Sequence, residues 1–140
     1  MSSTEYLETK VLTATPHQLH LLVIDGAIRH ATSAEGALLT GDFTRADGQI
    51  ERANQYVSEL IAGLKANKQP QLVDQLKSVF VFVQRTLSEA QRRHDPTRLA
   101  DGLSVLRLHR ETWLALGKKL TQETAAALPA ATASGFSWTS

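Results

Sequence analysis

Apolar residues recur at steps of three and four along most of this 140-residue chain, a spacing typical of amphipathic helices. It predicts four long helices, which extend approximately over residues 16–39, 43–66, 70–93 and 96–124. The segments between them favour helix ends and starts: Thr15-Pro16, Gly41-Asp42, Asn67-Lys68-Gln69-Pro70 and Asp95-Pro96. Because short turns join helices of similar length, the predicted fold class is all-α: an antiparallel up-down four-helix bundle with an N-terminal lead-in segment and a flexible C-terminal tail.

Taken alone, the β-branched and aromatic segment Val79–Val83 is typical of a buried strand. Its flanks favour a helix, because apolar residues continue on both sides at a period of 3.6: Val73, Leu76, Phe80, Val83, Leu87 and Ala90. Further apolar residues widen this face: Leu72, Val79 and Phe82. A helix that is apolar over so much of its circumference is buried on more than one side or offers a face to a partner.

Both ends of the chain differ from the predicted helices. In the lead-in before Thr15, polar residues interrupt four apolar ones: Tyr6, Leu7, Val11 and Leu12. Residues 125–140 carry no charge, are rich in Ala, Ser and Thr, and include a proline and a glycine, which predicts a mobile tail. We therefore divide the chain into a bundle domain, 1–128, and a flexible tail, 129–140, with two candidate docking residues in the tail: Phe136 and Trp138.

Composition narrows the class of protein. With 42% hydrophobic and 21% charged residues, the chain is expected to be one soluble globular domain and not a disordered one. A net charge of +1 gives no electrostatic indication of nucleic-acid binding. The chain contains no cysteine, no apolar run long enough to span a membrane and no signal-peptide pattern at its start. These features fit a cytoplasmic protein.

The histidines suggest two kinds of chemistry, and neither is well supported. His17 and His20 lie one helical turn apart and could share a metal, but metal sites in bundles use carboxylates or Glu-x-x-His pairs, and no Glu-x-x-His occurs. Histidine phosphotransfer domains are also four-helix bundles, so the candidate phosphoacceptors are His30, His94 and His109. No glycine-rich phosphate loop or nucleophile elbow is present. We expect no enzyme activity, no metal and no cofactor.

Asp25 and Gly26 allow two interpretations. Asp25 can form an intrahelical ion pair with Arg29, worth a few tenths of a kcal/mol. Alternatively, its carboxylate binds donors of another element and fixes the lead-in segment. Gly26 in a helix interior costs about 1 kcal/mol relative to alanine, which close approach of a neighbouring helix or peptide would explain.

Several separated motifs carry a resemblance to a known family. They are Tyr6 with Val11-Leu12-Thr13, the helix start Thr13-Ala14-Thr15-Pro16 with Leu19 and Asp25-Gly26-Ala27, the segments Ala53–Leu60 and Leu76–Asp95, and Glu111-Thr112-Trp113. In this order and spacing they resemble the FliS family of flagellin-specific export chaperones of bacterial flagella. The chain departs from the family pattern at Ile24, Phe80 and Phe82, where aromatic or tyrosine residues are usual, and at the sharp turn His94-Asp95-Pro96.

The resemblance implies a non-enzymatic cytosolic chaperone for the C-terminal region of flagellin, which prevents premature polymerisation and keeps flagellin competent for secretion. It implies that the lead-in covers part of the client groove, and that the flagellar export gate or a co-chaperone is a further candidate partner. The residues expected to bind flagellin are Tyr6, Leu7, Val11, Leu12, Leu19, Leu22, Val23, Asp25, Gly26 and Phe82. Two alternatives remain at this stage: a structural helical-bundle adaptor and a histidine phosphotransfer domain.

Overall fold

The structure is a computed structural model that describes residues 4–6, 14–66 and 68–132. These residues form helices and contain no β-strand: α2 (Pro16–Thr40), α3 (Phe43–Gly63), the 3-10 turn η1 (Leu64–Ala66), α4 (Pro70–Arg93) and α5 (Pro96–Thr132). Residues 4–6 form a short helical turn before α2. The predicted all-α fold is confirmed, and all four predicted helix starts are correct.

Local capping explains why the helices begin and end where they do. Thr15 accepts a hydrogen bond from the Gln18 amide at 3.1 Å, and the Gln18 side chain accepts one from the Thr15 amide at 3.0 Å, which completes a capping box at the start of α2. Gly41 ends α2 in the left-handed conformation with φ +79°. Asp42 and Asp95 then accept backbone hydrogen bonds at the starts of α3 and α5.

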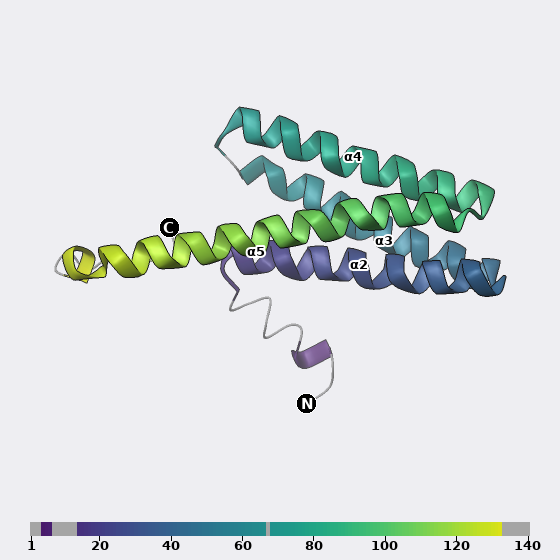
Figure 1. Ribbon diagram of the computed structural model, residues 1–140, viewed down its shortest axis with the longest axis horizontal. Coiled ribbons are helices and arrows are strands. Elements are labelled where there is room, and N and C mark those ends of the chain that lie inside the picture. Colours follow the sequence, from purple (N-terminus) through teal and green to yellow (C-terminus); the bar gives the residue numbers. More distant parts are fainter. Residues whose placement is uncertain (1–3, 7–13, 67, 133–140) are drawn as a thin grey trace.

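The helices form an up-down bundle in which each has two antiparallel neighbours (Figure 1). α2 and α4 both pack against α3 and α5. Alanines of α2 and α3 are fully buried where the helices pack together: Ala27, Ala31, Ala34, Ala46 and Ala53. Their complete burial makes them packing residues of the bundle itself, because small side chains let neighbouring helices approach closely.

The ambiguous segment Val79–Val83 lies within α4, so the helical interpretation is correct. Phe80 and Val83 are fully buried, whereas Phe82 is 41% exposed. Tertiary packing therefore overrides the local β-propensity, because the 3.6-residue period aligns the buried side chains on one face.

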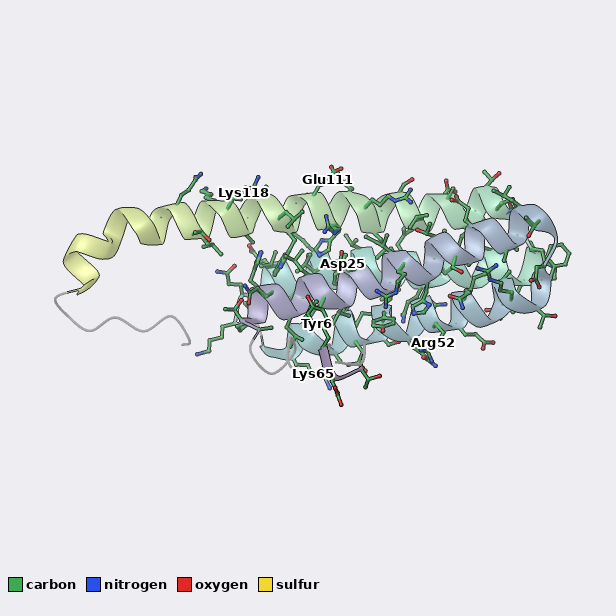
Figure 2. The ribbon with its side chains drawn as sticks, turned by 90° about the horizontal axis from the view of Figure 1, so that it is seen from below. Tyr6, Asp25, Arg52, Lys65, Glu111 and Lys118 are labelled. Atoms are coloured by element: carbon green, nitrogen blue, oxygen red, sulfur yellow. The ribbon has the colours of Figure 1, made fainter. Side chains whose placement is uncertain are left out.

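α5 is longer than predicted and continues through Thr132, past the end expected near Thr124. Alanine has the highest helix propensity, and the run Ala125–Ala127 extends the helix despite the nearby proline. The C-terminal part of α5 projects beyond the other helices (Figures 1 and 2). Figure 2 also shows that Glu111 and Lys118 point outward from α5. Phe136 and Trp138 lie outside the described residues, so the division at residue 128 stays a prediction.

Candidate functional site

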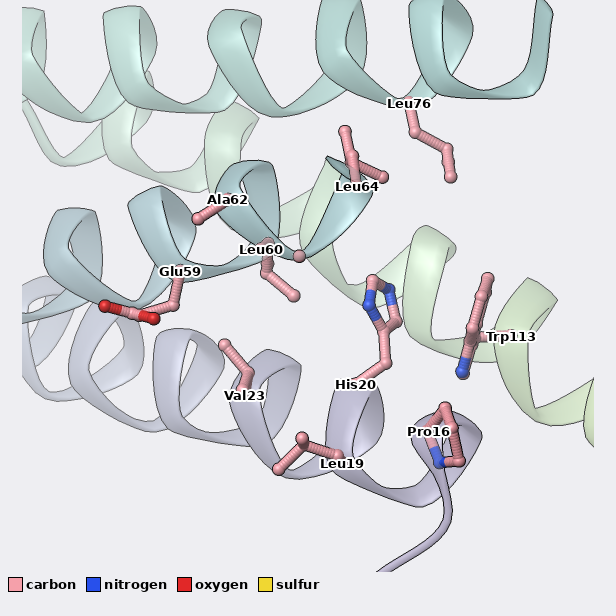
Figure 3. A pocket seen from close by; sticks show the side chains of 11 residues that line it. Pro16, Leu19, His20, Val23, Glu59, Leu60, Ala62, Leu64, Leu76 and Trp113 are labelled. Atoms are coloured by element: carbon pink, nitrogen blue, oxygen red, sulfur yellow. The ribbon is translucent and has the colours of Figure 1, made fainter. Parts of the chain in front are cut away.

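An apolar groove of about 580 Å³ lies at the end of the bundle where α2 begins, α3 ends and α4 begins. Its walls come from all four helices and η1: Pro16, Leu19, His20, Val23, Glu59, Leu60, Ala62, Gly63, Leu64, Leu76 and Trp113. In Figure 3 the leucines from above and the α2 side chains from below face a shared space, with His20 between them and Trp113 at one edge. Leu19 remains 40% exposed, so the described residues leave this apolar surface partly open to solvent.

Two histidines from different helices meet beside the groove, and one of them, His20, lines it. Nε2 of His20 on α2 lies 2.9 Å from Nε2 of His109 on α5, so one neutral ring donates a hydrogen bond and the other accepts it. Their surroundings are aromatic: the His20 ring lies 4.1 Å from the Trp113 ring, and Phe80 meets the His109 ring edge-on at 5.0 Å. Burial and, to a smaller extent, the neighbouring His109 and His17 together lower the pKa of His20 to about 4. Burial also lowers the pKa of His109.

A second contact fixes the first turn of α2 against α5. The His17 ring stacks on Trp113 with the ring centres 5.0 Å apart, and the Trp113 indole N–H donates to the His17 carbonyl at 3.1 Å. Gly117 makes room for His17, because a methyl group added there would lie 2.8 Å from the His17 Cε1 atom. Within the described part of the chain, no cluster of three or more potential ligands can hold a metal ion.

The candidate phosphoacceptor histidines have other partners. His109 is only 9% exposed and bonds to His20. The His30 Nδ1 atom lies 2.7 Å from the Gln49 side-chain oxygen. His94 stacks on Phe43 with the ring centres 4.1 Å apart. Each ring is held by a contact within the bundle, which leaves the phosphotransfer hypothesis without a freely exposed histidine among the three candidates.

Asp25 forms an ion pair between helices. Its Oδ1 atom accepts a hydrogen bond from the Arg110 Nε atom of α5 at 2.5 Å. Of the two interpretations of Asp25, the structure therefore favours a bond to another element. That element is α5, and an effect of Asp25 on the lead-in segment stays a prediction, because residues 7–13 lie outside the described residues. Both side chains are about two-fifths exposed, so the pair contributes at most about 1 kcal/mol.

Gly26 is buried where α3 crosses α2. A methyl group added at Gly26 would lie 2.7 Å from the Cδ1 and Cζ atoms of Tyr56, closer than van der Waals contact permits. The predicted close approach is therefore present, and the approaching group is an aromatic side chain of α3. Since Gly26 is covered by Tyr56, it shapes the bundle and does not line the groove.

The predicted client-binding residues are only partly brought together. Leu19 and Val23 line the groove, whereas Leu22 is half-buried outside its lining. The methyl group of Thr86 faces Gly102 of α5. Phe82 lies one turn before Thr86 in α4, so it is on the α5 side of that helix and outside the groove. Tyr6 is 55% exposed on the short turn before α2, which Figure 2 labels. The other lead-in residues, Leu7, Val11 and Leu12, lie outside the described residues.

The prediction missed His20 of α2 and groove residues contributed by the later elements: Leu60, Leu64, Leu76 and Trp113. Periodicity places apolar residues on helix faces but does not indicate which end of the bundle they occupy. The up-down topology was the available signal, because it brings the start of α2, the end of α3 and the start of α4 to the same end.

Comparison with known proteins identifies the family of this chain. A family model described as "Flagellar protein FliS" matches residues 1–120. The chain is 26% identical over 114 residues to the flagellar secretion chaperone FliS of Salmonella typhimurium (strain LT2), covering 81% of this chain and 84% of that protein. It is 24% identical over 110 residues to the flagellar secretion chaperone FliS of Bacillus subtilis (strain 168), covering 79% and 81%. The chain therefore belongs to the FliS family of flagellar secretion chaperones.

Proposed function

We propose that this chaperone binds the C-terminal region of flagellin in the cytoplasm, prevents its premature polymerisation and keeps it competent for flagellar type III secretion. The observation that carries the proposal is the open apolar groove between α2, α3, α4 and α5. Among the described residues, no helix is long and apolar enough to cross a membrane. A client segment that becomes ordered on binding loses conformational entropy, and burial of apolar surface along such a groove offsets that loss.

The groove suggests how the client is recognised. Its lining is mainly aliphatic and aromatic, which suits an amphipathic segment that presents apolar residues on one side. Leu19 and Val23 from the original prediction are retained as contacts, and Leu64, Leu76 and Trp113 are added. Phe82 would lie on a second surface of the chaperone and would contact the client only if it extends beyond the groove. Contact of the client with the lead-in residues stays a prediction, as does the involvement of an export gate or a co-chaperone.

Calorimetric titration with flagellin tests this proposal. Full-length flagellin should bind with a 1:1 stoichiometry and a negative ΔCp, as burial of apolar surface requires. Flagellin that lacks its last few dozen residues should not bind. Equal affinity for the two forms would contradict recognition of the C-terminal region.

Substitutions in the chaperone locate the site. Leu19→Glu places a charge in the groove, and because Leu19 is 40% exposed the bundle should still fold. It should weaken flagellin binding at least about tenfold, since a desolvated apolar contact is lost and a carboxylate is left near the client. Leu39→Glu is the matched control, because Leu39 lies at the opposite end of the same helix and is 71% exposed. It should bind as the unmodified protein does.

A further inference from the structure

The His20–His109 pair is an unusual feature for the wall of an apolar groove. The two Nε2 atoms lie 2.9 Å apart and join α2 to α5, and His20 itself lines the groove. Neutral rings satisfy this geometry, because one donates its only N–H and the other presents a lone pair. If both rings were protonated, both Nε2 atoms would carry hydrogen and face each other as cations at hydrogen-bond distance.

The groups around the pair give a positive charge little support. From α4, Leu76 lines the groove and Phe80 packs against both rings, and both side chains are apolar. α5 contributes Trp113 and Arg110, and Arg110 is paired with Asp25 of α2. The remaining facing groups are His17 of α2, which repels a protonated His20, and Glu59 of α3, which lies on the groove lining. Among these described groups, only Glu59 could favour a proton on the pair.

We propose that occupation of the groove is coupled to protonation of the His20–His109 pair: the occupied groove holds both rings neutral, and proton uptake favours the empty groove. This inference rests on the proposed function, since the occupant is the C-terminal segment of flagellin. The physical reason is desolvation. An apolar segment that covers His20 removes the water that would solvate a protonated ring, so binding disfavours the charged form.

The direction and size of the effect follow from linkage. Binding lowers the pKa of the pair below its value in the empty groove, which for His20 is already about 4, so affinity is constant well above pH 4 and falls as the pH decreases toward and below that value. Each unit by which the bound segment lowers the pKa of the pair decreases the affinity about tenfold, at a pH low enough to protonate the pair in both the free and the bound chaperone. The chaperone would therefore bind its client most tightly when the pair is neutral.

The test is calorimetric titration of the flagellin C-terminal segment at several values between pH 7.5 and 3.5, within the range where circular dichroism shows a folded bundle. The unmodified protein should lose about threefold in affinity at the acidic end of this range. The double variant His20→Gln/His109→Gln keeps amide donors and acceptors at the two positions but cannot be protonated there, so this part of the pH dependence should disappear. His30→Gln, which changes a histidine outside the groove lining, should behave as the unmodified protein does.

A measurement on the unmodified protein removes dependence on the variants. NMR titration of the His20 ring nitrogens should show a lower pKa when the flagellin segment is bound than when it is absent. The same pKa in both states, or the same pH dependence in the double variant and the unmodified protein, would overturn the coupling while leaving flagellin binding intact. Absence of binding at every pH would instead contradict the proposed function.

Discussion

Replacing Gly26 with alanine should destabilise the bundle, although the same change elsewhere in α2 should stabilise it. Alanine gains about 1 kcal/mol over glycine in a helix interior. At Gly26 the added methyl group would overlap the Tyr56 ring, with two ring atoms 2.7 Å away. Tyr56 is half-buried and its ring stacks on His30 with the ring centres 5.5 Å apart, which limits its movement. Overpacking of this kind costs about 1–3 kcal/mol, so a net loss of about 1 kcal/mol is expected.

Two comparisons make this prediction specific. Gly36 lies in the same helix with no atom within 4 Å of an added methyl group, so Gly36→Ala should stabilise the protein by about 0.5–1 kcal/mol. In a Tyr56→Ala background the obstructing ring is absent, and Gly26→Ala should then stabilise as Gly36→Ala does. Urea unfolding followed by circular dichroism at 222 nm measures each difference, and about 1 kcal/mol should shift the melting temperature by about 3–4 °C. If Gly26→Ala alone stabilises the protein as much as Gly36→Ala, the close-packing argument is wrong.

Three further predictions concern the His20–His109 pair, the Asp25–Arg110 pair and the residue that ends α4. The pKa of His20 is lowered from 6.5 to about 4 in the folded protein, so on acidification the unfolded chain binds a proton before the folded protein does. The free energy of unfolding should therefore be constant above pH 6.5 and decline by about 2–3 kcal/mol as the pH falls to 4. In urea unfolding, His20→Gln/His109→Gln should reduce this dependence of the free energy of unfolding on pH. A double-mutant cycle with Asp25→Asn and Arg110→Gln should give a coupling free energy below about 1 kcal/mol, and this coupling should decrease as salt is added. A larger coupling free energy that does not depend on salt would mean that the pair is shielded from solvent. His94 has φ +49°, so His94→Gly should be more stable than His94→Ala by about 1 kcal/mol in thermal unfolding, and equal stability would show that the left-handed backbone is not strained.

The fold could be predicted because local signals agree with one another along this chain. Thr15-Pro16, Gly41-Asp42 and Asp95-Pro96 mark helix boundaries by their own chemistry, and the structure places the boundaries there. The end of α5 could not be predicted in the same way. The high helix propensity of alanine and the nearby proline act in opposite directions, and the net free-energy difference between them is small.

The site was less predictable because it depends on contacts between distant residues. Periodicity assigns Leu64, Leu76 and Trp113 to apolar faces but does not say whether a face is covered. The pairing of His20 with His109 spans 89 residues and depends on the register between α2 and α5. Likewise, the sequence shows that Asp25 is charged, but it does not show that Arg110 lies opposite it across the helix interface.

The central claim, that the flagellin C-terminal segment occupies the groove, is tested most directly by mapping NMR chemical shifts during titration with that segment. The account predicts that the Trp113 indole signal and the methyl signals of Leu19, Val23 and Leu76 change together and saturate at one equivalent, because these groups line the groove. Signals from Leu39 at the opposite end of α2 should remain unchanged. Saturable binding that shifts the signals of that end while leaving the groove signals in place would contradict the account.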